Sequence, residues 1–70
     1  MVRVDLKKLK DLREDAKFSI SFVSNELGYQ TPTGYWLVER GERKVSIDVL
    51  FRLSKLYNVP MDELLIVEEE

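Results

Sequence analysis

The side chains of this sequence that could do chemistry are carboxylates, cations, hydroxyls and amides, because it contains neither histidine nor cysteine. The commonest general base and metal ligand is therefore absent, and so are thiol chemistry and disulfides. The sequence also pairs no nucleophile with a base and contains no glycine-rich phosphate loop. We therefore expect a protein that is not an enzyme and that holds neither a metal nor a cofactor.

The cations are grouped rather than evenly spread. No lysine or arginine occurs between Lys17 and Arg40, and Arg43 and Lys44 follow Arg40 closely. Two interpretations of this cluster are open, a surface that binds phosphate groups or an ordinary solvated loop. The stretch before the cluster instead offers amide and hydroxyl groups, at Gln30, Thr31 and Thr33.

The length and composition limit the protein that carries these side chains. Seventy residues allow one small domain, and a hydrophobic content of 44% supports a folded one. The sequence has no run near the ~20 apolar residues that span a membrane. Its first eight residues contain no uninterrupted apolar run, so they do not resemble a signal peptide. We therefore expect a cytoplasmic protein without a membrane segment.

Short helices must position these groups. The spacing of apolar residues and the capping residues predict five of them, over residues 5–15, 20–27, 31–40, 47–57 and 61–65. Ser19 and Ser46 are suited to cap helix starts, and Gly28 and Gly41 to end helices in the left-handed conformation. Gly34 lies in the first turn of the third helix, where it costs up to about 1 kcal/mol relative to alanine. It therefore indicates a close backbone approach, either to a neighbouring helix or to a ligand.

Two short helices around a tight glycine-containing turn are typical of helix-turn-helix proteins. The pattern residues include Leu12-Arg13, Phe18-Ser19, Leu27-Gly28, Val38-Glu39-Arg40-Gly41 and Asp62-Glu63-Leu64-Leu65. On these residues the chain from Leu6 to Leu65 resembles the Cro/lambda-repressor (XRE-type) helix-turn-helix family. The resemblance implies an all-α, compact five-helix domain over residues 1–67, with the helix-turn-helix formed by the second and third helices. Residues 68–70 form an acidic tail.

The resemblance implies double-stranded DNA as the partner and a role for each element. The helix near 31–40 is expected to enter the major groove, with base contacts from Gln30, Thr31, Thr33, Gly34, Trp36 and Leu37. The helix near 20–27 is expected to cross the DNA backbone with its N-terminus facing a phosphate. Phosphate contacts are expected from Lys17, Ser19, Ser21, Arg40, Arg43 and Lys44. Arg13 and Glu39 match a structural ion pair between the first and third helices.

This sequence departs from the family pattern within the motif. Ile20 replaces a common glutamine, Ser24 replaces a common small alanine, and the turn after Gly28 contains one extra residue. Because the front of the recognition helix lacks a cation, the usual bidentate arginine–guanine contact is not expected there. Amide, hydroxyl and methyl groups remain, so we predict a preference for half-sites that contain A/T base pairs.

The resemblance implies a sequence-specific transcriptional regulator of bacterial or phage type that binds an inverted repeat as a homodimer. An apolar run near the C-terminus supplies the candidate dimer surface: Met61, Leu64, Leu65, Ile66 and Val67. The alternative is a protein-binding module of antitoxin or anti-repressor type with little DNA affinity. The acidic composition and the apolar Trp36 and Leu37 motivate this alternative, since Trp36 could cover the core edge, touch DNA or dock a protein partner.

The net charge of −2 at first argues against DNA, since DNA-binding modules are usually basic. However, five of the 13 acidic residues lie in the last nine positions. Residues 1–61 carry 11 basic and 8 acidic side chains, a net charge of +3. The predicted DNA-binding body is therefore mildly basic, and we expect weak non-specific binding.

Overall fold

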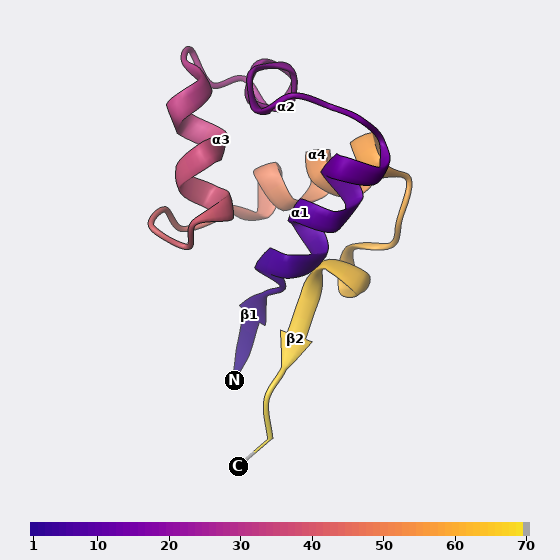
Figure 1. Cartoon of the computed structure of the whole chain (residues 1–70). Helices are drawn as coiled ribbons and strands as arrows, with labels where there is room; N and C mark the ends of the chain where they lie inside the picture. The colour runs from indigo at the N-terminus through magenta and orange to yellow at the C-terminus, as the bar shows by residue number, and fades with distance from the viewer. Residues whose placement is uncertain (70) are drawn as a thin grey trace.

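The computed structural model describes residues 1–69, so Glu70 of the predicted tail lies outside the described residues. The elements in chain order are β1 (Val2–Val4), α1 (Leu6–Asp15), α2 (Ile20–Glu26), α3 (Pro32–Glu39), α4 (Ile47–Tyr57), the 3-10 helix η1 (Met61–Leu64) and β2 (Leu65–Val67). The longest dimension is 37 Å. Figure 1 shows the two strands projecting from one end of the helical body, with α2 at the other end. Among these elements, none of the helices has the length and apolar character needed to cross a membrane.

The prediction of five helices is correct for α1 to α4 and wrong for the C-terminal part. Residues 61–64 form a single 3-10 turn after Pro60, and Leu65–Val67 form a strand. This strand pairs antiparallel with β1, in the register Val2↔Val67, Arg3↔Ile66 and Val4↔Leu65. β-Branched residues on both segments favour this pairing. The domain is therefore mostly helical with a small sheet that joins its two ends.

Side-chain caps begin three of the helices. The Asp5 carboxylate accepts a hydrogen bond from the Lys8 N–H, and the hydroxyls of Ser19 and Ser46 accept equivalent bonds at 3.0 and 3.1 Å. Each bond satisfies one of the free N–H groups of a first turn. The predicted caps at Ser19 and Ser46 are confirmed. α3 begins instead with Pro32, which lacks the N–H group that would otherwise need a partner.

Each α-helix of residues 1–69 ends in the same reversal of the chain. One residue after the last turn has a positive φ. Its own N–H and the N–H of the next residue donate hydrogen bonds back to the helix, as Lys17 and Phe18 do to the Glu14 and Arg13 carbonyls. The left-handed residues are Lys17, Gly28, Gly41 and Asn58. The prediction for Gly28 and Gly41 is confirmed. Lys17 has a side chain, unlike glycine, so its backbone is strained in the left-handed conformation.

The core lies where α1, α2, α3, α4 and η1 meet. Its buried side chains are Leu9, Val23, Leu27, Tyr35, Val38, Leu50, Leu53 and Leu64. Tyr35 and Val38 face inward, as the helical spacing of α3 predicts. Leu64 is fully buried among them, so its prediction as a dimer residue is wrong. Apolar packing therefore fixes the inner faces of α2 and α3 in the core. The outer face of α3 remains exposed to solvent.

Candidate nucleic-acid interface

The joint between α2 and α3 is held by a buried hydroxyl. Ser24 donates a hydrogen bond to the Thr31 carbonyl at 2.6 Å and accepts one from the Tyr35 N–H at 3.2 Å. A single side chain on α2 thus satisfies backbone groups on both sides of the first turn of α3. The Ser24 hydroxyl therefore fixes the point at which α3 starts relative to α2.

An ion pair ties α1 to the end of α3. The Arg13 Nε lies 2.7 Å from Glu39 Oε2, and a second guanidinium nitrogen donates to the other carboxylate oxygen at 3.2 Å. Arg13 also donates to the Phe18 carbonyl at 3.1 Å. The two side chains are only 15% and 8% exposed, and the hydrogen bond to Glu39 raises the pKa of Arg13. The structure thus brings together the two residues that the resemblance paired.

The inner side of α3 is also linked to α4 through two tyrosines. The Tyr35 and Tyr57 hydroxyl oxygens lie 3.2 Å apart, and the Tyr57 ring stacks on that of Phe18. Burial raises the pKa of both tyrosines, because it disfavours the phenolate. α3 is therefore anchored at its start by Ser24, along its inner face by Tyr35 and at its end by Glu39.

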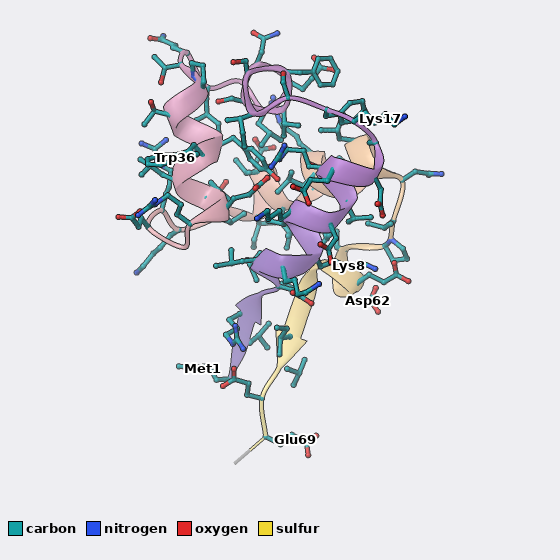
Figure 2. The ribbon with its side chains drawn as sticks, viewed as in Figure 1. Met1, Lys8, Lys17, Trp36, Asp62 and Glu69 are labelled. Atoms are coloured by element: carbon teal, nitrogen blue, oxygen red, sulfur yellow. The ribbon has the colours of Figure 1, made fainter. Side chains whose placement is uncertain are left out.

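The outer face of α3 is bordered by two stacks of a guanidinium on an aromatic ring. Arg40 lies over Trp36 at 4.5 Å, and Arg43 lies over Tyr29 at 5.2 Å. Trp36 is 44% exposed on the surface of α3 (Figure 2), so it is a surface residue rather than a core residue. Trp36 and Gly34 lie about 160° apart around α3, with Thr33 and Leu37 between them. The Tyr29 ring packs against Gly34, so Thr33 and Leu37 lie between the two stacks.

The close approach at Gly34 is to neither a helix nor a ligand. A Cβ on Gly34 would lie 2.5 Å from the Tyr29 ring, so the approach is to a side chain of the α2–α3 loop. Gly34 is buried, so the prediction of a base contact from Gly34 is wrong. Sequence reasoning missed the role of Tyr29. The Tyr29 ring, which packs against Gly34, holds the Arg43 guanidinium beside the first turn of α3, although this turn itself contains no cation.

The other predicted contact residues lie at or near the surface. Those that are exposed are Lys17, Ser19, Ser21, Gln30, Thr31, Thr33, Arg40, Arg43 and Lys44, whereas Leu37 is half-buried. Arg40 forms an ion pair with Glu42, which offsets part of its charge. Figure 2 shows Lys17 well apart from Trp36, so Lys17 does not belong to the stack of Arg40 on Trp36.

The cationic surface continues from α3 towards the sheet. A hollow of about 370 Å³ lies between β1 and the α3–α4 loop, and its cations are Arg3, Arg43 and Lys44. Arg3 forms an ion pair with Glu68 of the tail. Within residues 1–69, histidine, cysteine, aspartate and glutamate do not gather in a group that could hold a metal ion. The chemistry of this surface is therefore that of guanidinium, ammonium, hydroxyl and aromatic groups.

Comparison with known proteins places this geometry in a family. A family model described as helix-turn-helix matches residues 9–64. The chain belongs to the Cro/lambda-repressor (XRE-type) helix-turn-helix family. This XRE-type domain is 38% identical over 60 residues to a protein of Pyrococcus horikoshii that is provisionally named an HTH-type transcriptional regulatory protein. It is 37% identical over 57 residues to a protein of Pyrococcus abyssi with the same kind of name.

These two matches cover 86% and 81% of the XRE-type domain but only 19% and 18% of the relatives. The chain therefore spans about a fifth of the length of the curated relatives that it matches. The shared part contains α2 and α3, the two elements that form the helix-turn-helix.

Proposed function

We propose that this XRE-type domain is a sequence-specific DNA-binding transcriptional regulator that places the outer face of α3 in the major groove. The observation that carries the proposal is the arrangement of that face, with polar and methyl groups in the middle and a guanidinium on each side. Such an arrangement matches a groove whose base edges lie between two phosphate backbones. The names of the two relatives support the same function.

Base contacts are proposed for the exposed residues at the front and middle of α3. Gln30 can pair with adenine, Thr31 and Thr33 can contact either kind of base, and Leu37 can pack on a thymine methyl group. Trp36 borders this set and stacks under Arg40. These side chains favour A/T base pairs at the positions they face, and Arg43 can add a phosphate contact at the flank.

Phosphate contacts are proposed for two groups of residues. Arg40, Arg43 and Lys44 form one group, and Lys17 with the hydroxyls of Ser19 and Ser21 forms the other. Each cation that contacts a phosphate should contribute about −0.9 to the slope of log affinity against log salt. Because stacking on a ring restricts a guanidinium, Arg40 and Arg43 lose little conformational freedom when they bind.

A random-site selection followed by binding titrations tests the proposal. We expect an A/T-containing consensus, and Arg43→Ala should weaken binding to all sequences similarly and reduce the salt slope by about 1. Lys55→Ala is the matched control, because its ammonium lies on α4 over Phe51, outside the proposed contact set. A selection that returns a G-rich consensus would contradict the proposed base contacts. An absence of binding at low salt would contradict DNA binding altogether.

We also propose that the domain acts as a homodimer on an inverted repeat. One recognition helix contacts too few base pairs to select a site in a genome, and two-fold symmetry doubles the number of contacts. The selection described above tests this point too, since it returns two half-sites at a fixed spacing if the proposal is correct. A consensus with a single half-site would contradict it.

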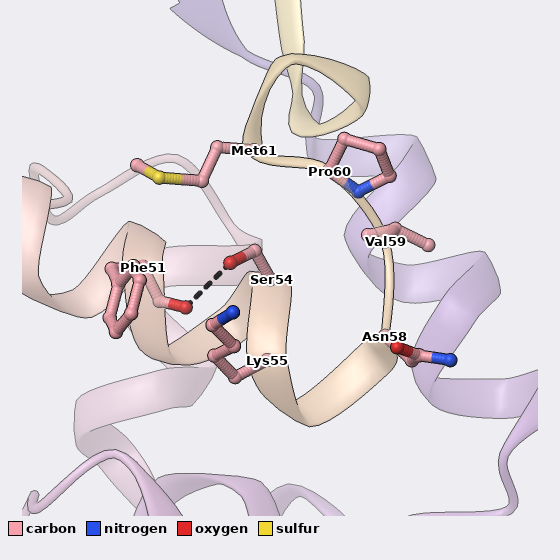
Figure 3. Close-up of a pocket in the computed structure, with 7 residues that line it drawn as sticks. All are labelled: Phe51, Ser54, Lys55, Asn58, Val59, Pro60 and Met61. Atoms are coloured by element: carbon pink, nitrogen blue, oxygen red, sulfur yellow. Dashed lines mark hydrogen bonds between the residues drawn. The ribbon is translucent and has the colours of Figure 1, made fainter.

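A protein-binding module remains the second candidate function. The observation that favours it is an exposed apolar area on α4, where Ile47 and Phe51 are 80% and 48% exposed. Phe51 borders a hollow of about 550 Å³ whose other walls include Val59, Pro60 and Met61 (Figure 3). Exposed apolar surface of this kind can mark a protein contact. DNA binding that is absent at low salt, together with a soluble folded domain, would favour this candidate.

A further inference from the structure

The hollow between β1 and the α3–α4 loop has an apolar floor. We call it the Lys44 hollow; its volume is about 370 Å³, and Val4, Leu6 and Val45 form the floor. All three side chains are half-buried. Val4 and Val45 also pack against the core, and the Leu6 side chain lies against the backbone of Gly41. This volume and a mainly apolar lining are typical of sites that bind small molecules.

Three exposed cations surround this floor: Arg3, Arg43 and Lys44. Arg3 forms an ion pair with Glu68, and the Arg43 guanidinium stacks on the Tyr29 ring. Within the described residues 1–69, Lys44 takes part in none of the ion pairs. Three cations and one carboxylate leave a net charge of +2 around the floor. The Lys44 ammonium is therefore the group of this rim that can accept an anion without giving up a partner.

Both walls of the Lys44 hollow are held by backbone hydrogen bonds. On one side β1 is paired with β2. On the other side, the Glu42 and Gly41 N–H groups donate to the Leu37 and Val38 carbonyls at 2.9 and 3.0 Å. Because these bonds do not depend on a ligand, the hollow is preformed. A ligand that enters it loses little affinity to the ordering of the chain.

We propose that the Lys44 hollow binds a small carboxylate with an apolar body, and that this ligand competes with DNA for Lys44. The apolar body covers the floor and removes its surface from water, while the carboxylate pairs with the ammonium. An inorganic anion leaves the floor in water, and an uncharged apolar molecule leaves the cations without a partner. The floor and the rim together thus select this class of ligand.

The competition with DNA rests on the proposed function. Lys44 is one of the residues proposed to contact a phosphate, so a bound carboxylate occupies its ammonium and places a negative charge beside the DNA backbone. One phosphate contact contributes about −0.9 to the salt slope, which corresponds to about tenfold in affinity at ~50 mM salt. The ligand should therefore act as an antagonist that lowers DNA affinity by about this factor.

A titration with octanoate, followed through the backbone amide resonances, tests the site. We expect the amides of Val4, Leu6 and Val45 to shift with a dissociation constant of about 1 mM. Octanamide has the same apolar body without the charge, and acetate has the charge without the body. Both should bind at least about tenfold more weakly. Octanamide that binds as tightly as octanoate, or shifts centred on Phe51 and Met61 of the hollow beside α4, would overturn the proposal.

Two lysine variants locate the carboxylate. Lys44→Gln should weaken octanoate binding about fivefold, because it removes the paired ammonium. Lys55→Gln is the matched control, since its ammonium lies over Phe51 beside the other apolar hollow, and it should change the affinity by less than about twofold. Both lysines are exposed, so neither substitution disturbs the core. Equal losses in the two variants would overturn the proposal.

DNA binding separates this inference from the proposed function. Saturating octanoate, compared with acetate at the same concentration, should lower the DNA affinity of the wild type about tenfold at ~50 mM salt. It should change that of Lys44→Gln by less than about twofold, because this variant already lacks the contact. Octanoate that occupies the hollow and leaves the DNA affinity of the wild type unchanged would overturn the competition.

Two other outcomes decide between the ligand site and the proposed function. If octanoate occupies the Lys44 hollow but the wild type binds no DNA at low salt, the proposed function fails and the ligand site stands. If the wild type binds DNA but octanoate shifts none of the floor amides, the ligand site is wrong and DNA binding stands.

Discussion

Replacement of Ser24 by alanine should destabilise this domain, although alanine is common at this position in the family that the chain belongs to. The hydroxyl is 1% exposed and joins the Thr31 carbonyl to the Tyr35 N–H. After Ser24→Ala, the Thr31 carbonyl keeps its bond from the Gly34 N–H at 3.2 Å. The buried Tyr35 N–H, however, loses the acceptor to which it is bound. The main cost is therefore one unsatisfied backbone donor.

The magnitude follows from these contacts. An unsatisfied buried donor costs about 1–3 kcal/mol, and alanine returns about 0.5 kcal/mol through its higher helix propensity. A partial shift of the Tyr35 N–H towards the Thr31 carbonyl recovers some of the loss. We expect a net decrease of about 1.5 kcal/mol in the free energy of unfolding. For a domain of this size the melting temperature should fall by roughly 6–12 °C.

Urea unfolding followed by circular dichroism measures this change, with Ser54→Ala as the matched control. Ser54 is also buried, but its hydroxyl donates to the Phe51 carbonyl of its own helix at 2.7 Å. Loss of that bond frees no backbone donor, so Ser54→Ala should change stability by less than about 0.5 kcal/mol. If Ser24→Ala is as stable as the wild type, or if both variants lose the same amount, the assigned role of Ser24 is refuted.

Three further predictions follow from the same structure. Arg13→Met and Glu39→Gln should each lower the free energy of unfolding by about 3 kcal/mol, because each single change leaves a buried charge unpaired. The double variant should lose less than the sum of the two, and additive losses in a double-mutant cycle would contradict this. Lys17→Gly should stabilise the domain by about 0.5–1 kcal/mol by relieving its left-handed backbone while weakening DNA binding, and a thermal melt that shows lower stability would contradict it. Because burial raises the pKa of Tyr35 and Tyr57 in the folded state, stability should be fully present below the unfolded tyrosine pKa of about 10 and fall as the pH rises above it. Unfolding measured between pH 8 and 12 checks the sign, and stability that increases above pH 10 would refute it.

Local signals made most of the helical part predictable from the sequence. Gly28 and Gly41 mark helix ends because glycine adopts the left-handed conformation without strain. Lys17 and Asn58 adopt the same conformation. The helices before them end where they were predicted to end, near residues 15 and 57, but the left-handed backbone of these two residues was not predicted. Asn58 carries a recognisable signal, since asparagine tolerates this region, but a lysine there has none.

The sheet was not predictable by the same means, because its two strands are almost a whole chain apart. Leu65–Val67 is a three-residue apolar run, which periodicity cannot assign to a helix or a strand. Its pairing partner is Val2–Val4, and only the tertiary fold brings the two together. The sequence therefore predicted a helix over residues 61–65 in place of the strand, and Leu64, which was expected at the dimer surface, is a core residue.

The candidate site divides in the same way into local and distant contacts. The Trp36–Arg40 stack joins residues four apart on one helix, so the spacing alone could have indicated it. The Tyr29–Arg43 stack depends on the path of two loops and on the missing side chain at Gly34. Only the structure brings that guanidinium to the front of α3.

The pairing of β1 with β2 also sets an order of events in folding. The hydrogen bonds of helices α1 to α4 join residues that are close in the sequence. The pairing of Val2 with Val67, in contrast, closes a loop of nearly the entire chain. Closing a loop of this length costs about 4 kcal/mol of chain entropy, which two short strands repay only when the core beneath them is complete. The sheet should therefore be the last element to form and the first to open. Transient opening of the two ends would expose the chain to proteases while the helix-turn-helix remains folded.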